Sequence, residues 1–327
     1  MPGPVLDVRD LRTYLFTRWG TVKAVDGVSF TVDAGETLGL VGESGSGKSM
    51  TCLSILRLAP KPAARILGGE VLLDGVDLLQ KSEREMRRVR GKQVSMILQD
   101  PMSSLNPVFT VGMQVREPIV LHQRLRGRPL AERAIELLSS VGIPSPQARL
   151  RAFPHQLSGG MRQRVVGAMA ITAPPRLLIA DEPTTSLDLT IQAQYLRLLK
   201  DLQARHHLAM IFVTHNLGII ARMCDRVAVM YAGRIVEAGP VRRIFERPAH
   251  PYTKALVGAI PAFGAARRRL LAIEGQPPDG AALPSGCAFH PRCPEAFARC
   301  RKAPPPEEFR LAADHATRCW LWDGSAR

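Results

Sequence analysis

The chain has 327 residues, of which 46% are hydrophobic, so it is long enough to bury the core of one large α/β domain with an appendage. Its apolar runs are too short to span a bilayer, and its first residues lack the apolar stretch of a secretory signal. The formal net charge is +15 at pH 7, but the arginines are scattered and form no basic face studded with aromatic residues. We therefore expect no nucleic-acid partner.

The first part of the chain alternates strand-like and helical patterns. Strands are predicted at Val28–Val32 and Thr37–Val41, and a helix follows from Lys48 to about Leu58. Further β-rich stretches cover Glu70–Leu73 and Val94–Leu98. The order at the start is therefore strand, glycine-rich loop, helix.

Between Asp100 and Leu157 the pattern changes to helical segments with proline breaks, including Val111–His122 and Leu130–Val141. This change predicts an inserted helical subdomain at about residues 100–160. Strands and helices then alternate again. Strands are expected at Leu177–Asp181, Ala209–Thr214, Val227–Tyr231 and Arg234–Glu237, and helices from Leu189 to about Ala204 and, in a short segment, toward Met223. Such alternation predicts a mainly parallel sheet covered by helices.

The glycine-rich loop matches G-x-x-x-x-G-K-[ST] in full, after a predicted strand and before a predicted helix, which is the context that this motif requires. Its glycines let consecutive N–H groups surround phosphates, Lys48 adds a positive charge, and Ser49 offers a hydroxyl to Mg²⁺. The residues expected to bind ATP here are Gly42, Ser44, Gly45, Ser46, Gly47, Lys48 and Ser49.

Polar side chains follow three of the later strands. Asp181 and Glu182 end an apolar strand, where Asp181 would hold Mg²⁺ and Glu182 would polarise the attacking water as general base. Gln99 follows another strand and could contact both Mg²⁺ and that water, while His215 could donate to the γ-phosphate. Each of these residues alone is equally compatible with an ordinary strand end or loop.

A short run upstream of these carboxylates, Leu157 to Met161, contains Ser158, Gly159 and Gly160 and precedes a predicted helix. Glycines before a helix N-terminus form an anion site. Farther along, Ser186, Leu187 and Asp188 are typical of a turn and helix cap.

Taken together and in this order, these motifs resemble the nucleotide-binding subunits of ABC transporters over roughly residues 5–260. The resemblance implies an ABC-type P-loop NTPase fold with a β-subdomain and the helical insert. It also implies a dimer in which Ser158, Gly159 and Gly160 contact the partner's ATP, with Ser186 to Asp188 beside them. The family ends this signature in Gln, where this chain has Met161. Trp19 is the best candidate for the aromatic that stacks on adenine, with Tyr14 and Phe16 as rivals.

Three further segments narrow the resemblance to the ATPases of bacterial dipeptide and oligopeptide importers. They are Gln99–Pro107, Phe153–Gln156 before the signature, and His250–Thr253 after the core. This resemblance implies a nucleotide-binding domain over residues 1–263 and a small cysteine-rich extension over residues 264–327. Related subunits carry nickel, glycosides or opines, and a soluble ABC ATPase acting on nucleic acid is a less favoured alternative.

The extension carries four of the six cysteines, Cys287, Cys293, Cys300 and Cys319, with the spacing Cys-x5-Cys-x6-Cys-x18-Cys. Zinc knuckles use tighter cysteine pairs, so the residues alone leave an iron–sulfur cluster, zinc, and unliganded thiols or a disulfide open. The importer resemblance favours a [4Fe-4S] cluster.

The same resemblance implies the partners and location of the subunit. They are a second, related ATPase, two membrane-spanning permeases and an external solute-binding protein, with this subunit peripheral on the cytoplasmic face of the inner membrane. A groove beside the helical insert and the Gln99 loop would take a permease helix.

Overall fold

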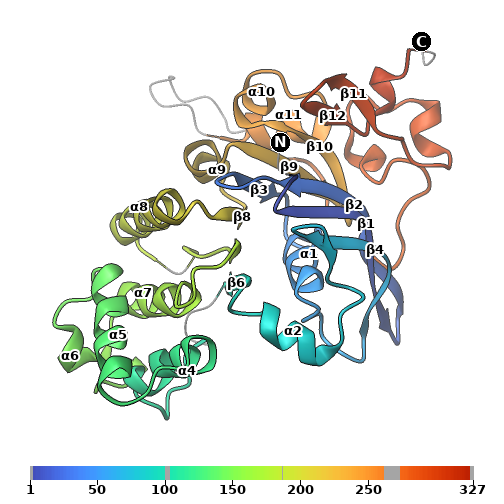
Figure 1. Ribbon diagram of the computed structural model, residues 1–327. Coiled ribbons are helices and arrows are strands. Elements are labelled where there is room, and N and C mark those ends of the chain that lie inside the picture. The colour runs from blue at the N-terminus through green and yellow to red at the C-terminus, as the bar shows by residue number, and fades with distance from the viewer. Residues whose placement is uncertain (1–2, 100–103, 186, 261–272, 325–327) are drawn as a thin grey trace, which may run out of the picture. The chain divides into compact units, whose positions relative to one another are not determined.

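The computed structural model describes residues 3–99, 104–185, 187–260 and 273–324. These residues form two compact units (Figure 1). The first unit consists of Met1–Leu6, Val32–Glu36 and Gln80–Val213, and the second of Asp7–Thr31, Thr37–Leu79 and Thr214–Arg327.

The second unit contains five consecutive strands of one sheet, in the order β11-β12-β10-β9-β3. Strand β3 (Thr37–Val41) runs parallel to β9 (Arg226–Tyr231), and its residues are all buried. The other pairs, which involve β10 (Arg234–Pro240), β12 (His315–Thr317) and β11 (Phe309–Ala312), are antiparallel. Two strands of the C-terminal extension therefore continue the sheet that carries the phosphate loop.

A second sheet in this unit has the order β2-β1-β4-β5. Its strands are β1 (Leu6–Thr17), β2 (Gly20–Val32), β4 (Ala64–Leu73) and β5 (Val76–Asp77). Strand β2 contains the predicted strand Val28–Val32 but begins earlier, and β1 was not predicted because its charged residues hide the alternation of buried and exposed positions.

The helices of the second unit are α1 (Lys48–Ile55), α9 (Leu217–Met223), α10 (Val241–Glu246) and α11 (Pro251–Gly258), with short 3-10 turns at His290–Arg292, Ala298–Arg301 and Trp320–Trp322. Helix α1 ends before the predicted Leu58 because Arg57 adopts a left-handed conformation with φ of 54°.

The core of the second unit joins the nucleotide-binding strands to the extension. Val41, Ile220, Tyr252 and Phe289 belong to one cluster of buried residues. Phe289 is 1% exposed although it lies among prolines and cysteines, so the extension supplies a core residue rather than only surface loops.

The first unit has the parallel strands β6 (Val94–Ile97), β7 (Leu177–Asp181) and β8 (Ala209–Val213), paired in the order β8-β7-β6. These strands confirm the predicted positions. Their nearly continuous burial follows from a parallel sheet that is covered on both faces.

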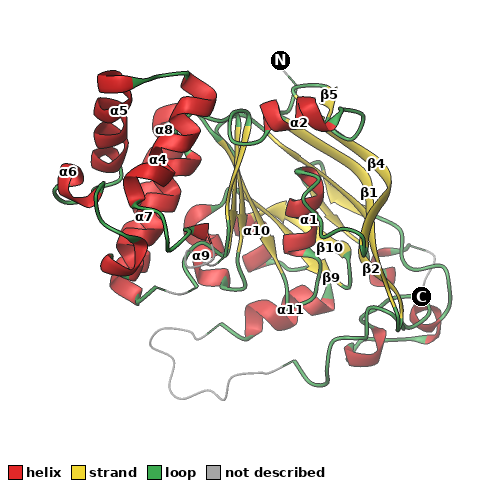
Figure 2. Cartoon of the chain, turned by 90° about the horizontal axis from the view of Figure 1, so that it is seen from below, coloured by secondary structure: helices red, strands yellow, loops and turns green. Residues whose placement is uncertain are grey.

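Three helices of the first unit, seen from another side in Figure 2, lie beside α7 (Gly159–Ala170) or beside a helix that packs on it. Helices α4 (Val111–Gln123) and α5 (Gly127–Ser140) pack on each other and on α7, and the one-turn helix α6 (Pro146–Arg149) packs on α5. The described part of this unit also contains α2 (Glu83–Val89), α8 (Leu189–His206) and a 3-10 turn at Pro154–Gln156. The helical segments predicted after Asp100 and at Gly159 are confirmed.

Among the described residues, every helix is too short or too polar to pass through a bilayer.

Glu237 on β10 fastens the extension to the rest of the second unit. Its fully buried carboxylate accepts hydrogen bonds from the backbone N–H groups of Ala249 and His250, both at 2.8 Å, and lies 2.8 Å from His315 Nε2. A buried carboxylate with several partners is costly to remove because its partners lose their acceptor together.

We predict that Glu237→Ala lowers the free energy of unfolding by about 3 kcal/mol, measured by urea denaturation. The matched control is Glu246→Ala, because Glu246 forms an exposed pair with Arg242 one helical turn away. The control should change stability by less than about 0.5 kcal/mol. Equal effects of the two variants would contradict this role of Glu237.

Candidate functional site

The phosphate loop lies between β3 and α1 and holds the lysine of the motif in place. Lys48 is 6% exposed, and its ammonium group donates to the backbone carbonyls of Gly42 at 2.7 Å and Glu43 at 2.9 Å. Because a buried ammonium group is costly without anionic or carbonyl partners, this arrangement presents a positive charge that is ready for phosphate.

Gly47 cannot be replaced in this loop without moving the backbone. It has φ of 104°, and a Cβ at this position would collide with the carbonyl oxygen of Ala24 on β2. On the other side, Gly233 N–H donates to the carbonyl of Ser46 at 3.0 Å, and Asp26 N–H donates to the carbonyl of Gly233 at 2.8 Å. The loop is therefore packed against β2 and the turn between β9 and β10.

The aromatic candidates for adenine stacking differ in their surroundings. Trp19 lies in the turn between β1 and β2, is 78% exposed and has the Arg18 guanidinium 4.4 Å from its ring centre. Phe16 is 41% exposed and lies beneath Arg65, whereas the Tyr14 hydroxyl donates to Asp26 at 2.7 Å. Tyr14 is thus tied to the strand, and the exposed ring of Trp19 is open to a ligand.

In the first unit, the predicted catalytic residues Gln99 and Glu182 lie together. The Gln99 amide donates to the Glu182 carboxylate at 3.3 Å, and the Thr185 hydroxyl donates to it at 2.9 Å. Glu182 follows β7 in a left-handed conformation with φ of 44°, which is uncommon for a residue with a side chain and recurs at functional sites. Asp181, at the end of β7, is 4% exposed.

The signature residues stand at the start of α7. Ser158 is the N-cap of this helix, and its hydroxyl accepts from the Met161 N–H at 3.3 Å. A Cβ on Gly160 would come within 2.5 Å of Ile191 on α8, whereas a Cβ on Gly159 would meet open space. Gly160 is therefore required for packing, and Gly159 leaves the backbone at the helix N-terminus open to approach.

The predicted turn after the carboxylates caps α8. The Asp188 carboxylate accepts from the N–H groups of Thr190 at 3.1 Å and Ile191 at 3.0 Å, which confirms the expected cap. Leu187 precedes it, and Ser186 lies outside the described residues.

His215 is an exposed residue of the second unit, immediately before Asn216, the N-cap of α9. Ser49 lies in the first turn of α1 and is partly buried. The phosphate-loop residues and His215 thus belong to the second unit, while the carboxylates, Gln99 and the signature belong to the first.

All four cysteines of the extension line one small cavity in the second unit. Burial raises the pKa of Cys287, that of Cys293 to about 11 and that of Cys319 to about 12, so these thiols hold their protons at neutral pH. All six cysteines of the chain are free thiols, which excludes a disulfide in this structure. No group of three or more His, Cys, Asp or Glu side chains within the described ranges is arranged to hold a metal ion.

Two buried nitrogen atoms of residues that line this cavity lack a hydrogen-bond partner, His250 Nε2 and Trp320 Nε1. His250 Nδ1 accepts from the Tyr252 N–H at 3.0 Å, so a neutral ring carries its proton on Nε2. Burial lowers the pKa of His250 to about 3, which keeps the ring neutral. The cavity is therefore lined by four sulfur atoms and by two residues with an unused N–H donor.

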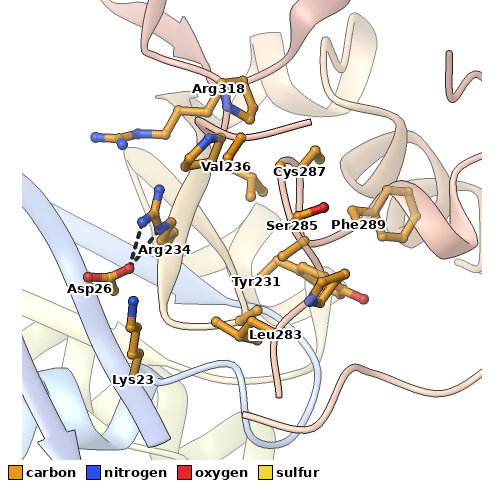
Figure 3. A pocket seen from close by; sticks show the side chains of 17 residues that line it. Lys23, Asp26, Tyr231, Arg234, Val236, Leu283, Ser285, Cys287, Phe289 and Arg318 are labelled. Atoms are coloured by element: carbon orange, nitrogen blue, oxygen red, sulfur yellow. Dashed lines mark hydrogen bonds and ion pairs between the residues drawn. The ribbon is translucent and has the colours of Figure 1, made fainter. Parts of the chain in front are cut away.

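A larger cavity of about 260 Å³ lies between the β9–β10 turn and the extension (Figure 3). The Arg234 guanidinium at its edge donates to Asp26 at 2.6 and 3.0 Å, and Tyr231, Cys287 and Phe289 line the other side. The extension therefore lies next to strands β9 and β10, with this cavity between them.

Sequence reasoning missed the residues that link the extension to the phosphate loop. The Arg292 guanidinium pairs with the Glu43 carboxylate at 2.7 and 2.9 Å, and the Tyr252 hydroxyl accepts from the Glu43 N–H at 2.9 Å. A signal was present in the sequence, because Arg292 stands directly before Cys293 and Glu43 is an acidic residue inside an anion-binding loop. The pair could not be predicted, because the two residues are far apart in the sequence.

Comparison with known proteins identifies the family. The sequence profile of the ABC transporter domain matches residues 25–185, and that of the C-terminal region of oligopeptide/dipeptide transporters matches residues 236–300. The oligopeptide transport ATP-binding protein of Bacillus subtilis is 50% identical over 97% of this chain and 88% of its own length. The dipeptide transport ATP-binding protein of the same organism is 47% identical over 98% of this chain and 96% of its own length.

A dimeric ATP-binding cassette solved with ADP and phosphate has a similar fold. It superposes with a TM-score of 0.65 and 26% identity, covering 72% of this chain and 99% of its own. This fold, and the sequence identity to the two transport proteins over nearly the whole chain, agree with the order of the nucleotide-binding motifs. The chain therefore belongs to the ATP-binding proteins of ABC transporters, in the oligopeptide and dipeptide branch of that family.

Proposed function

We propose that this chain binds and hydrolyses ATP to energise the import of dipeptides and oligopeptides through a membrane ABC transporter. The observation that carries the proposal is the buried Lys48 ammonium, held by the carbonyls of Gly42 and Glu43 inside a complete phosphate loop. On ATP binding, this ammonium would exchange carbonyl partners for phosphate oxygens, which are stronger acceptors.

The remaining site residues would act on the γ-phosphate and its water. Ser49, Gln99 and Asp181 would hold Mg²⁺, which neutralises the charge on the phosphates when bound. Glu182 would orient and polarise the attacking water, since its carboxylate is already positioned by Gln99 and Thr185. His215 would donate to the γ-phosphate.

Each ATP would lie between two nucleotide-binding domains. The open backbone at Gly159, together with Ser158 and Gly160, supports contact with the ATP of the partner, and Ser186 to Asp188 would lie beside it. The exposed ring of Trp19 would stack on adenine. We further propose that the second ATPase is a related chain, so that the pair is a heterodimer.

Residues 1–263 would form the nucleotide-binding domain, with a helical subdomain at about residues 100–160, and residues 264–327 the extension. The packing of α4 and α5 on each other supports a helical subdomain. Two permeases and an external solute-binding protein would complete the transporter, with this subunit on the cytoplasmic face of the inner membrane. Nickel, glycoside or opine import would use the same ATPase chemistry.

We also propose that Cys287, Cys293, Cys300 and Cys319 hold a [4Fe-4S] cluster. The support is their convergence on one cavity, together with the unpartnered Nε2 of His250 and Nε1 of Trp320. N–H donors beside such a cluster can hydrogen-bond its sulfur atoms. Because the cysteines are not arranged to hold a metal ion here, loading would require their side chains to close inward and to release protons.

Glu182→Gln should retain ATP and lower turnover by about 10²- to 10⁴-fold, because the amide cannot accept the proton of the attacking water. Calorimetric ATP binding and phosphate release measure the two effects. Glu132→Gln, in an exposed pair with Arg128, is the control and should match the wild type. Unchanged turnover in Glu182→Gln would remove this residue from the role of base.

Ser158→Arg should abolish hydrolysis while a single chain still binds ATP, because a long cation at the signature blocks closure onto the partner's nucleotide. Ser139→Arg on the exposed side of α5 is the control. Hydrolysis at the wild-type rate in Ser158→Arg would contradict a shared ATP site.

Anaerobically purified protein should contain iron and acid-labile sulfide in equal amounts, and Cys319→Ser should lower both. Cys224→Ser should keep them, because Cys224 lies outside the cavity. Zinc at about one per chain without iron would overturn the cluster proposal.

A further inference from the structure

Glu43, the second residue of the phosphate loop, is held from three sides. Its N–H donates to the Tyr252 hydroxyl at 2.9 Å, and its carbonyl accepts from Lys48 at 2.9 Å. Its carboxylate accepts hydrogen bonds from Nη1 and Nη2 of Arg292, at 2.7 and 2.9 Å. The residue next to Gly42 is therefore fixed through both its backbone and its side chain.

The Arg292–Glu43 pair differs from the surface ion pairs of this protein. The Arg292 side chain is 5% exposed and that of Glu43 is 27% exposed, whereas the Arg242–Glu246 pair is 86% and 58% exposed. A bidentate pair that is mostly shielded from water is stronger and geometrically more restrictive than an exposed one.

Arg292 is itself fixed in place. Its Nε donates to the carbonyl of Glu274 at 3.0 Å, and Nη1 also reaches the Tyr231 hydroxyl at 3.3 Å. Just before it, Phe289 packs against the rings of Tyr231 and Tyr252 at centroid distances of 5.2 and 5.3 Å. The guanidinium thus has hydrogen-bond partners other than Glu43 that hold it in place.

We propose that Arg292 is a positioning residue for ATP: through Glu43 it fixes the phosphate loop in the conformation that binds the phosphates. This inference rests on the proposed function of the loop and adds a residue of the extension to it. Arg292 precedes Cys293 directly, so the segment that carries the cysteines also supplies the outer support of the nucleotide site.

Arg292 could instead serve only to attach the extension to the rest of the second unit, and the two roles predict different effects on ATP binding. Loss of a fastener would lower stability without a specific effect on nucleotide affinity. Loss of a positioning residue instead raises the Kd and KM for ATP in protein that remains folded, and a conservative replacement keeps part of the affinity. Lys keeps the charge of Arg but cannot form the two parallel hydrogen bonds.

The test uses the full chain with bound Mg-ATP measured by calorimetry, and hydrolysis measured in the assembled transporter. Arg292→Ala should weaken ATP binding about tenfold and raise KM by the same factor, with a smaller change in kcat. Arg292→Lys should recover part of the affinity, and Glu43→Gln should reproduce the defect with an unaltered side-chain shape. Arg242→Ala is the control and should bind ATP like the wild type.

Two further comparisons make the result decisive. The double variant Arg292→Ala with Glu43→Gln should bind ATP no more weakly than the worse single variant, because both substitutions remove the same interaction. Lys48→Ala should lose ATP binding. If Lys48→Ala binds normally, the nucleotide site itself is wrongly assigned. If Lys48→Ala fails but Arg292→Ala and Glu43→Gln bind like the wild type, or if their effects simply add, the positioning role is overturned.

Discussion

The phosphate loop must keep its N–H groups open to phosphate and must also be rigid, and the contacts of the second unit meet both requirements. Its backbone N–H groups have to stay open for phosphate, so they cannot be tied up in a helix or strand. The loop must nevertheless be rigid, because each N–H has to point at the same anion. Support therefore comes from outside, through Gly233 on the β9–β10 turn, the hydroxyl of Tyr252 and the guanidinium of Arg292.

This requirement explains why a cysteine-rich segment forms part of the core. Phe289 and Tyr252 pack with Tyr231, and Glu237 binds the N–H groups that lead into α11 as well as His315 of β12. Each contact joins a residue of the extension or its approach to a strand beside the loop. A ligand held by the four cysteines would sit on the same framework and stiffen it further.

The sequence predicted the strands and helices that carry the site better than the contacts that support them. Local patterns located β3, α1, β7 and the helix at Gly159, because alternation, glycine spacing and capping are short-range signals. The Asp188 cap was also predicted from a motif, and the structure adds a contact between Gln99 and Glu182, which the sequence had singled out separately. By contrast, β1 and the short strands β11 and β12 carry mixed polar patterns, and Arg292–Glu43 joins residues that are far apart in the chain. Such pairs depend on tertiary packing, which no local pattern encodes.

The decisive measurement is a high-resolution structure of the transporter with Mg-ATP bound to this subunit. We expect Lys48 to leave the carbonyls of Gly42 and Glu43 for the phosphates, while both Arg292–Glu43 hydrogen bonds keep their lengths of 2.7 and 2.9 Å. An ATP-bound phosphate loop from which Arg292 has separated would contradict this expectation.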